Sequence, residues 1–293
     1  MAAPRRLSEL PGWQEDGLED ALAAYTATAP AGWPRPSGEA RSFFESAFRP
    51  ERADDGLLTG YFEPEMAGSL TRTRDFGVPL FAPPPGLIGD GAGPDRRQIL
   101  REGLAEGSEI AWVADALDAY LAQVQGSARI RLAGGGLLRL GFAAKNGHPY
   151  RSIGAELIRR GAVAAGDMSV QAIRAWCDAH PADVEELLFC NPSFAFFRAL
   201  DLPGTSGPLG ACGVPVTPMR TIAADLTLVA PGTPVWLESF GSERLRRLVL
   251  VQDAGAAITG AGRADLFVGS GSAAGERAGR LREACRLTRL VPR

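Results

Sequence analysis

Hydrophobic and polar positions along the chain predict both helices and strands in its first two thirds and mostly short strands after them. In residues 109–125 apolar side chains recur about every 3.6 residues, which is typical of an amphipathic helix. Ser108 is placed to cap the start of this helix and Gly126 to end it. Further helices are expected over residues 18–25, 41–48, 153–160, 169–178 and about 274–284.

Strands are predicted in three regions. Residues 56–64 form an apolar run that ends in a turn, and residues 128–145 predict a hairpin because two alternating runs flank a triple glycine. After about residue 200, short apolar runs separated by Gly and Pro predict a small barrel. Residues 76–95 are rich in Gly and Pro and are expected to form a loop.

The composition is that of a globular protein with a sizeable core, since 45% of the 293 residues are hydrophobic and 22% are charged. The net charge of −3 argues against a nucleic-acid partner, which requires a basic face. The apolar runs are too short to span a bilayer, and no signal peptide is visible. The four cysteines lack CxxC spacing and are expected to be buried free thiols.

Several familiar site patterns are missing from the sequence. The two histidines, His148 and His180, and the widely spaced cysteines do not support a metal site. Neither a phosphate-binding GxxxxGK[ST] nor a GxGxxG follows a strand, and GxSxG is absent. The glycine-rich run at 269–275 has no adjacent lysine, so it is a weak candidate for an anion loop. No metal and no cofactor are therefore expected.

Three aspartates in the strand-rich region are candidates for acid–base chemistry. Asp253 follows the apolar run 248–251, Asp265 precedes another, and Asp225 lies in IAADLT. Burial at the edge of a strand raises the pKa of a carboxyl group, and a raised pKa suits a general acid. The alternative is that each aspartate only caps a turn or accepts backbone amides.

Taken together, these segments resemble the lytic murein transglycosylase A family, whose C-terminal part is called the 3D domain. The order and spacing hold from about residue 7 to the C-terminus, and KNGHPYRSIG and NPSFAFF are specific signals. The matching stretches are LPGW (10–13), LLTGYFEPEMAGS (57–69), GVPLFAPP (77–84), VQGS (124–127), GFAAKNGHPYRSIG (141–154), SVQAIRAW (169–176), NPSFAFF (191–197), GVPVTPMRTIAAD (213–225), VQDAGAAITG (251–260) and RADLFVGSG (263–271).

The resemblance implies a mainly β fold with peripheral helices. Residues 1–64 and 199–293 would form a discontinuous double-psi β-barrel, and residues 65–198 an inserted smaller β domain, with a groove for a glycan strand between them. A monomer in the periplasm or cell envelope is implied, with the peptidoglycan glycan strand and the cell-wall synthesis or division machinery as partners. The lipid-anchor cysteine of the family is not visible, because the first cysteine is Cys177.

The implied reaction is cleavage of the β-1,4 bond between N-acetylmuramic acid and N-acetylglucosamine, leaving a 1,6-anhydro-muramyl end. The resemblance identifies Asp265 as the single catalytic carboxyl, which gives a proton to the glycosidic oxygen and then takes one from the sugar O6 hydroxyl. Asp253 would raise the pKa of Asp265 or supply negative potential. Asp225 would have a structural role.

The resemblance also implies a binding surface around the chain's single lysine. Asn191 and Ser193 are expected to fix a turn before the core aromatics Phe194, Phe196 and Phe197. The expected substrate-binding residues are Thr59, Tyr61, Glu63, Gln125, Ser127, Lys145, Asn146, His148, Tyr150 and Arg151. For those of KNGHPYRS, residues 145–152, the alternative is a satisfied network of loop hydrogen bonds.

The chain departs from the family after Asp253, where DAGAAITG replaces a run close to DTGGAIKG. Ala254 thus replaces a residue with a hydroxyl group, Ala256 replaces a glycine, and Thr259 replaces a lysine of the family run. This departure keeps a non-catalytic peptidoglycan-binding module open as an alternative. A conventional glycosidase that uses Asp253 and Asp265 as two carboxylates is the other alternative.

Overall fold

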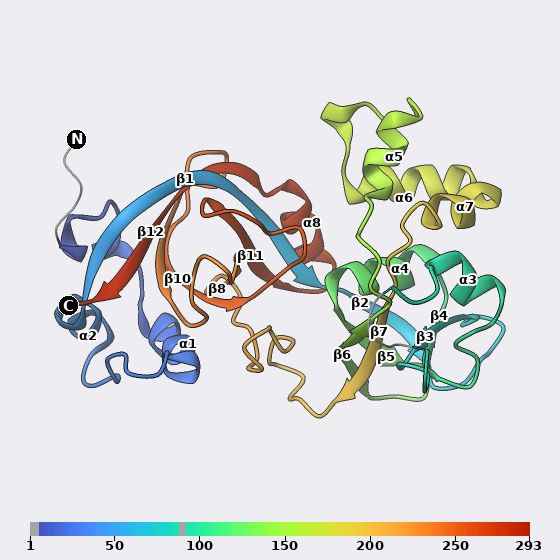
Figure 1. Cartoon of the computed structure of the whole chain (residues 1–293), viewed down its shortest axis with the longest axis horizontal. Helices are drawn as coiled ribbons and strands as arrows, with labels where there is room; N and C mark the ends of the chain where they lie inside the picture. Colours follow the sequence, from blue (N-terminus) through green and yellow to red (C-terminus); the bar gives the residue numbers. More distant parts are fainter. Residues whose placement is uncertain (1–5, 88–91) are drawn as a thin grey trace. The chain divides into compact units, whose positions relative to one another are not determined.

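The computed structural model describes residues 6–87 and 92–293, with the backbone alone at positions 52 and 53. The chain divides into two compact units of similar length (Figure 1). The first unit comprises Met1–Phe62, Leu209–Gly269 and Ala273–Arg293, and the second comprises Glu63–Pro208 and Ser270–Ser272. None of the helices in the described ranges has the length and apolar character that crossing a membrane requires.

The first unit is a closed six-stranded barrel with the strand order β1-β11-β8-β10-β9-β12 (Figure 1). The pair β8–β10 is parallel, and the pairs β1–β12, β12–β9, β9–β10 and β8–β11 are antiparallel. The strands are β1 (Phe48–Glu63), β8 (Thr221–Ala223), β9 (Pro234–Ser239), β10 (Arg246–Asp253), β11 (Arg263–Ser270) and β12 (Arg282–Pro292). The barrel with its peripheral helices confirms the mainly β fold class.

Every barrel strand sends apolar side chains to one interior cluster, which contains Leu58, Ile222, Leu237, Val251 and Leu266 among others. A second cluster covers part of the outer face of the barrel, where helices from the N-terminal segment pack on β9, β10 and β12. These N-terminal helices are η1 (Leu7–Glu9), η2 (Trp13–Glu15), α1 (Glu19–Thr28) and α2 (Ala40–Ala47). The helix α8 (Ser272–Arg280) packs against the interior cluster through its alanines.

The second unit is a six-stranded sheet in the order β3-β4-β2-β5-β6-β7 with helices around it. Its strands are β2 (Glu65–Ser69), β3 (Val78–Phe81), β4 (Glu109–Val113), β5 (Ser127–Leu132), β6 (Leu137–Lys145) and β7 (Ala195–Leu200). Its helices are α3 (Arg96–Arg101), α4 (Ala116–Gln125), α5 (Ile153–Arg159), η3 (Ala165–Asp167), α6 (Val170–Ala179), η4 (Pro181–Asp183) and α7 (Val184–Leu188). The three phenylalanines after Asn191 are buried, as predicted.

The predicted helix over 109–125 is wrong in its first half. Residues Glu109–Val113 form β4, which pairs with β3, so the helix begins only after Asp115. The Asp115 side chain caps α4 by accepting the Asp118 amide, which replaces the predicted cap at Ser108. The predicted end is confirmed, because Gly126 has the left-handed φ of +75° that suits a glycine at this position.

Two other predictions also need correction. The predicted loop over 76–95 contains β3, whereas its residues 88–91 lie outside those described. The predicted final helix ends at Arg280 and is followed by the long strand β12. The other predicted helices and the hairpin are confirmed by α1, α2, α5, α6 and β5–β6.

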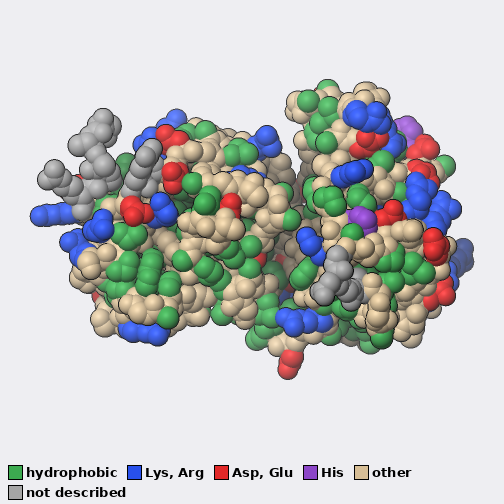
Figure 2. Space-filling model, viewed as in Figure 1, with side chains coloured by type: hydrophobic (Ala, Val, Ile, Leu, Met, Phe, Trp, Pro, Cys, Tyr) green, Lys and Arg blue, Asp and Glu red, His purple; other side chains and the backbone are tan. Residues whose placement is uncertain are grey.

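The four cysteines are free, as predicted, although Cys190 and Cys212 are only partly buried. Within the described residues no group of three or more His, Cys, Asp or Glu side chains is arranged to hold a metal ion. Lys and Arg side chains are interspersed with Asp and Glu on the visible face of each unit (Figure 2).

Candidate active site

Asp253 and Asp265 lie on the two strands that flank β8, at the same level of the barrel. Both have Ala223 as their register partner, Asp253 from β10 and Asp265 from β11. Because β8 lies between β10 and β11, and neighbouring strands are roughly 4.8 Å apart, the Cα atoms of Asp253 and Asp265 are separated by about 10 Å. The next pair, Leu266 and Ile222, belongs to the interior cluster, which places Asp265 and Ala223 on the outer face.

A bulge in β10 brings Asp253 to this outer face. Val251 points into the barrel, and strict alternation would send Asp253 inward as well. The register with β8 shifts between Val251 and Asp253, so Gln252 is the extra residue. Gln252 is buried, accepts the Thr221 hydroxyl at 2.5 Å, and donates to Ala24 O and Thr28 Oγ1 of α1. Gln252 therefore anchors the irregularity that sets the position of Asp253.

Gln252→Leu is expected to lower the free energy of unfolding by roughly 2–3 kcal/mol, because it leaves buried partners unsatisfied. Turnover should fall as well, since the bulge before Asp253 loses its attachment to α1. Urea unfolding and an activity assay measure the two effects. Thr28→Ala is the matched control, because it removes one of the same contacts and should be milder. Wild-type stability in Gln252→Leu would show that the bulge needs no such anchor.

The end of β1 contributes two polar side chains to the same face. Leu58 belongs to the interior cluster, so Thr59 and Tyr61 point outward. The Thr59 hydroxyl donates to Asp265 Oδ1, and the Tyr61 hydroxyl donates to Asp253 Oδ2 at 2.7 Å. The Tyr61 ring packs on Phe267 with 5.2 Å between ring centroids. The structure thus brings together four of the predicted site residues on one barrel face.

The environment of Asp265 favours its neutral form. Burial raises the pKa of this carboxyl group, and the nearby Asp253 carboxylate raises it further. The hydrogen bond from Thr59 and the Arg263 guanidinium act in the opposite direction and lower the pKa. The net effect is a raised pKa, which is the property expected of a general acid.

Asp253 is held more tightly than Asp265. Its Oδ1 accepts the backbone amides of Ala211 at 3.0 Å and Ala254 at 2.9 Å, while Oδ2 accepts Tyr61. Burial raises the pKa of Asp253, although these three hydrogen bonds lower it. Asp253 also helps to raise the pKa of Tyr61, whose burial is the larger cause. Only the amide of Ala254 is used, so its methyl side chain does not affect this bond.

Asp225 lies in a turn away from these contacts. Its carboxylate accepts the amide and hydroxyl of Thr227 and the amide of Gly260. These bonds, that from Gly260 foremost, lower the pKa of Asp225. Asp225 therefore ties the turn after β8 to the loop between Asp253 and Asp265.

Glu63 is 0% exposed and does not present its carboxylate to solvent. Its oxygens accept Arg129 Nε at 2.6 Å, Arg139 Nη2 at 2.9 Å and Ser270 Oγ at 2.9 Å. The Gly271 amide also donates to the Glu63 carbonyl oxygen at 2.9 Å. This network joins β5 and β6 to Ser270 within the second unit, and it gives the predicted sugar contact of Glu63 no support.

The stretch KNGHPYRS begins with the last residue of β6, Lys145, and contains both exposed and buried positions. Asn146 is buried, and its side chain bonds Pro94 O, Pro192 O and the Phe194 amide, so it fits the loop-network alternative. His148 Nε2 lies 2.7 Å from Gly93 O. The side chains of Lys145, Tyr150 and Arg151 are exposed.

The other predicted residues of the second unit lie near the ends of α4 and α7. Gln125 is partly buried and Ser127 is buried at the start of β5. Asn191 is buried, and its Oδ1 accepts the amides of Arg151 at 3.0 Å and Ser193 at 3.2 Å. Asn191 therefore holds the turn that carries Arg151.

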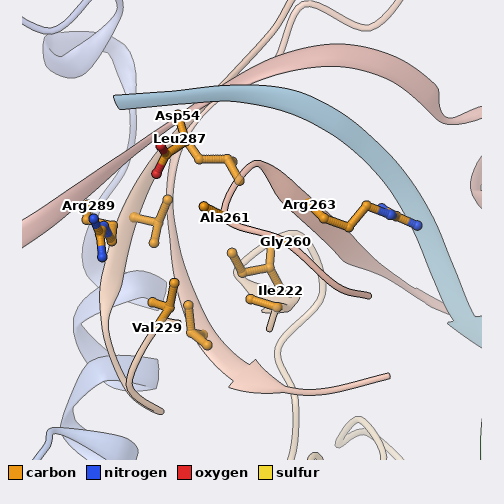
Figure 3. Close-up of a pocket in the computed structure, with 11 residues that line it drawn as sticks. Asp54, Ile222, Val229, Gly260, Ala261, Arg263, Leu287 and Arg289 are labelled. Carbon is orange, nitrogen blue, oxygen red and sulfur yellow. The ribbon is translucent and has the colours of Figure 1, made fainter. Parts of the chain in front are cut away.

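A pocket of about 310 Å³, which includes space open to solvent, lies at the interior side of the barrel. Several lining residues, among them Ile222 and Leu287, belong to the interior cluster, and neither Asp253 nor Asp265 lines the pocket. The Arg263 side chain leaves the pocket and extends toward β1 (Figure 3). Neither aspartate therefore lines this pocket, although Arg263, which shares the face of β11 with Asp265, does.

Comparison with known proteins decides the family. Residues 57–198 match the MltA specific insert domain, and residues 220–291 match the 3D domain. Membrane-bound lytic murein transglycosylase A of Escherichia coli (strain K12) is 36% identical over 264 residues, which cover 84% of this chain and 70% of that protein. The chain belongs to the MltA family.

Solved structures of lytic transglycosylases share its fold. A membrane-bound lytic murein transglycosylase from Agrobacterium tumefaciens is 28% identical with a TM-score of 0.85, covering 98% of this chain and 96% of that one. The lytic transglycosylase LtgG of Burkholderia pseudomallei is 39% identical with a TM-score of 0.70, covering 100% and 96%. E. coli MltA with bound chitohexaose is 32% identical with a TM-score of 0.73, covering 86% and 77%.

Two residues that contribute to this site of the MltA protein, Arg263 and Gln252, were not predicted from the sequence. Arg263 precedes Asp265 by two positions on β11, and this spacing puts both on one face of a strand. That spacing was a usable signal for Arg263. Gln252 gave no comparable signal, because a bulge depends on the pairing partner.

Proposed function

We infer that this chain is a lytic transglycosylase that cleaves the glycan strand of peptidoglycan, the activity for which its MltA relatives are named. The observation that carries this inference is a half-buried Asp265 with a raised pKa on the barrel face shared with Asp253. Such a carboxyl holds a proton that it can give to a leaving oxygen.

One carboxyl is sufficient if the sugar supplies its own nucleophile. Asp265 donates its proton to the glycosidic oxygen, and the bond from C1 to that oxygen breaks. The O6 hydroxyl of the same muramyl residue attacks C1, and the Asp265 carboxylate takes the O6 proton. The products are a free hydroxyl on one side and a 1,6-anhydro end on the other, so no water is consumed. Asp265 returns to its neutral form for the next cycle.

The contacts of Asp253 support an electrostatic role over a second catalytic carboxyl. A glycosidase needs its second carboxylate free to activate water or to attack the sugar. Both oxygens of Asp253 already accept hydrogen bonds, two from backbone amides and one from Tyr61. Its negative charge instead raises the pKa of Asp265 and favours the positive charge that develops on the sugar ring.

We propose that the exposed side chains of Lys145, Tyr150 and Arg151 contact the glycan or its peptide stem. The ammonium of Lys145 suits an N-acetyl group, and the ring of Tyr150 suits a pyranose ring. The guanidinium of Arg151 suits a carboxylate. The E. coli relative with bound chitohexaose supports a glycan as the ligand class. The curated relatives are named membrane-bound, which supports the cell envelope as the site of action. Partners in cell-wall synthesis or division stay a prediction.

Digestion of purified sacculi should release fragments whose muramyl ends are lighter by one water than ordinary reducing ends. Mass analysis of the soluble products reads this directly, and a lysozyme digest of the same sacculi provides the hydrolysed standard. Ordinary reducing ends would identify a hydrolase. Binding to sacculi without soluble products would identify a non-catalytic module.

A further inference from the structure

Arg263 is the cation next to the proposed acid, yet it reaches Asp265 through another residue. Its Nη2 donates to Thr59 Oγ1 at 2.8 Å, and Thr59 Oγ1 donates to Asp265 Oδ1. Arg263 Nη1 donates to Ala264 O at 2.6 Å and lies 3.4 Å from Leu57 O, so the guanidinium is held from two strands. Among residues 6–87 and 92–293, no carboxylate oxygen lies within 4.0 Å of the Arg263 guanidinium nitrogens.

The two contacts favour one direction along this chain. A guanidinium donates and cannot accept, and a threonine hydroxyl has one proton. The bond from Arg263 polarises the Thr59 hydroxyl, which makes its oxygen a weaker acceptor and its proton a stronger donor to Asp265 Oδ1. A neutral carboxyl has one carbonyl oxygen and one hydroxyl oxygen. Asp265 Oδ1 is the acceptor in this bond, which leaves the acid proton on Oδ2.

We propose that Arg263 is a positioning residue that acts through the Thr59 hydroxyl to fix which oxygen of Asp265 delivers the catalytic proton. This role rests on the proposed function of Asp265 as the single acid and base. In the first half of the reaction Oδ2 gives its proton to the glycosidic oxygen. In the second half Oδ2 accepts the O6 proton, while Thr59 keeps Oδ1 hydrogen-bonded throughout.

The groups around Asp265 determine how its titration responds. Thr59 and Tyr61 face it from β1, Arg263 from its own strand and Asp253 from β10, whereas β8 contributes the uncharged Ala223. Arg263 lowers the pKa of Asp265, so its removal should raise that pKa. The acid would then stay protonated to higher pH, and the alkaline limb of the kcat/KM profile would move to higher pH.

Kinetics on purified glycan strands test this role with Arg263→Gln, Thr59→Val and the double variant. Arg263→Gln should lower kcat about tenfold at nearly constant KM and move the alkaline limb to higher pH. In the Thr59→Val background the same change should lower kcat by about twofold or less, because the hydroxyl that transmits it is gone. Arg263→Lys keeps a charged donor and should leave the limb at its wild-type pH.

Three outcomes would overturn the proposal. An unmoved pH limb in Arg263→Gln would show that the charge does not act on Asp265. Equal loss of kcat in the wild-type and Thr59→Val backgrounds would show that Thr59 does not transmit the effect. Full activity of Asp265→Asn would overturn both this role and the proposed function. If Asp265→Asn is inactive, an unmoved pH limb or an equal loss of kcat in the two backgrounds would overturn the role of Arg263 alone. Thermal unfolding of each variant separates these results from loss of the fold.

Discussion

Asp265→Asn should reduce turnover of peptidoglycan by at least about 10³-fold, because one carboxyl performs both proton transfers. An amide neither donates an acidic proton to the glycosidic oxygen nor accepts the O6 proton. The carbonyl oxygen of the introduced amide can still accept the Thr59 hydroxyl, so the hydrogen bond that holds this side chain persists. Release of soluble anhydro-ended fragments from sacculi measures the loss.

The same substitution should not destabilise the fold at neutral pH. Burial raises the pKa of Asp265 in the folded chain above that in the unfolded chain. Its contribution to stability is therefore fully present below the unfolded pKa and is lost as pH rises through the folded pKa. The introduced amide does not ionise, so the free energy of unfolding of Asp265→Asn should equal or exceed that of the wild type near pH 7. Urea unfolding at several pH values measures this difference.

Asp225→Asn is the matched control for the loss of activity. Asp225 holds a turn through Thr227 and Gly260 and takes no part in the contacts between Asp253, Asp265, Thr59 and Tyr61. Turnover of the same order as the wild type is expected. If Asp265→Asn kept wild-type turnover, another residue would be the acid. If Asp225→Asn were as inactive as Asp265→Asn, the loss would reflect barrel structure instead of proton transfer.

Asp253→Asn should lower turnover by about 10²-fold, because it removes a negative charge near the developing positive charge of the sugar. It should also move the alkaline limb of kcat/KM to lower pH. The Asp253 carboxylate raises the pKa of Asp265, so its loss lowers that pKa and the acid ionises earlier. This shift is opposite in sign to that expected for Arg263→Gln.

Tyr61→Phe is the control that separates charge from hydrogen bonding at Asp253. It removes the 2.7 Å bond to Oδ2 and leaves the carboxylate in place. The alkaline limb should therefore not move to lower pH in Tyr61→Phe. If Asp253→Asn left the limb unchanged, the Asp253 charge would not control Asp265. Ordinary reducing ends in wild-type products that vanish in Asp253→Asn would instead favour a two-carboxylate glycosidase.

The sequence and the family resemblance together led to the candidate acid and to much of its surroundings. Asp253 and Asp265 stand near the ends of apolar runs, but only the resemblance singled out Asp265 as the acid and added Thr59 and Tyr61. The glycine-punctuated runs after residue 200 predicted the barrel because closed sheets need short strands joined by turns. Local patterns carried the prediction of the barrel, whereas the resemblance carried the choice of Asp265, Thr59 and Tyr61.

The features that the sequence did not reveal depend on distant pairing. Residues 109–113 fit a helical period and a strand equally well, and pairing with β3 decided for the strand. Gln252 forms a bulge only because β8 lies beside β10. Glu63 shares its face of β1 with Tyr61, yet Arg129 and Arg139 bury its carboxylate completely. Burial of a charged group is compensated by partners that are far away in the sequence.

The final strand gave only a short signal in the sequence. Burial alternates over residues 282–287, and Cys285 and Leu287 point into the barrel on either side of the exposed Arg286. Apolar and polar residues alternate only over 285–288, which is too short to end the expected helix near Arg280.

Digestion of sacculi in water enriched in ¹⁸O tests the central claim most directly. An intramolecular attack by O6 uses no water, so the soluble products should carry 1,6-anhydro ends without ¹⁸O, and Asp265→Asn should release almost none of them. A lysozyme digest in the same water shows the label that hydrolysis introduces. Labelled reducing ends from the wild-type protein, or unlabelled anhydro ends from Asp265→Asn at the wild-type rate, would contradict the account.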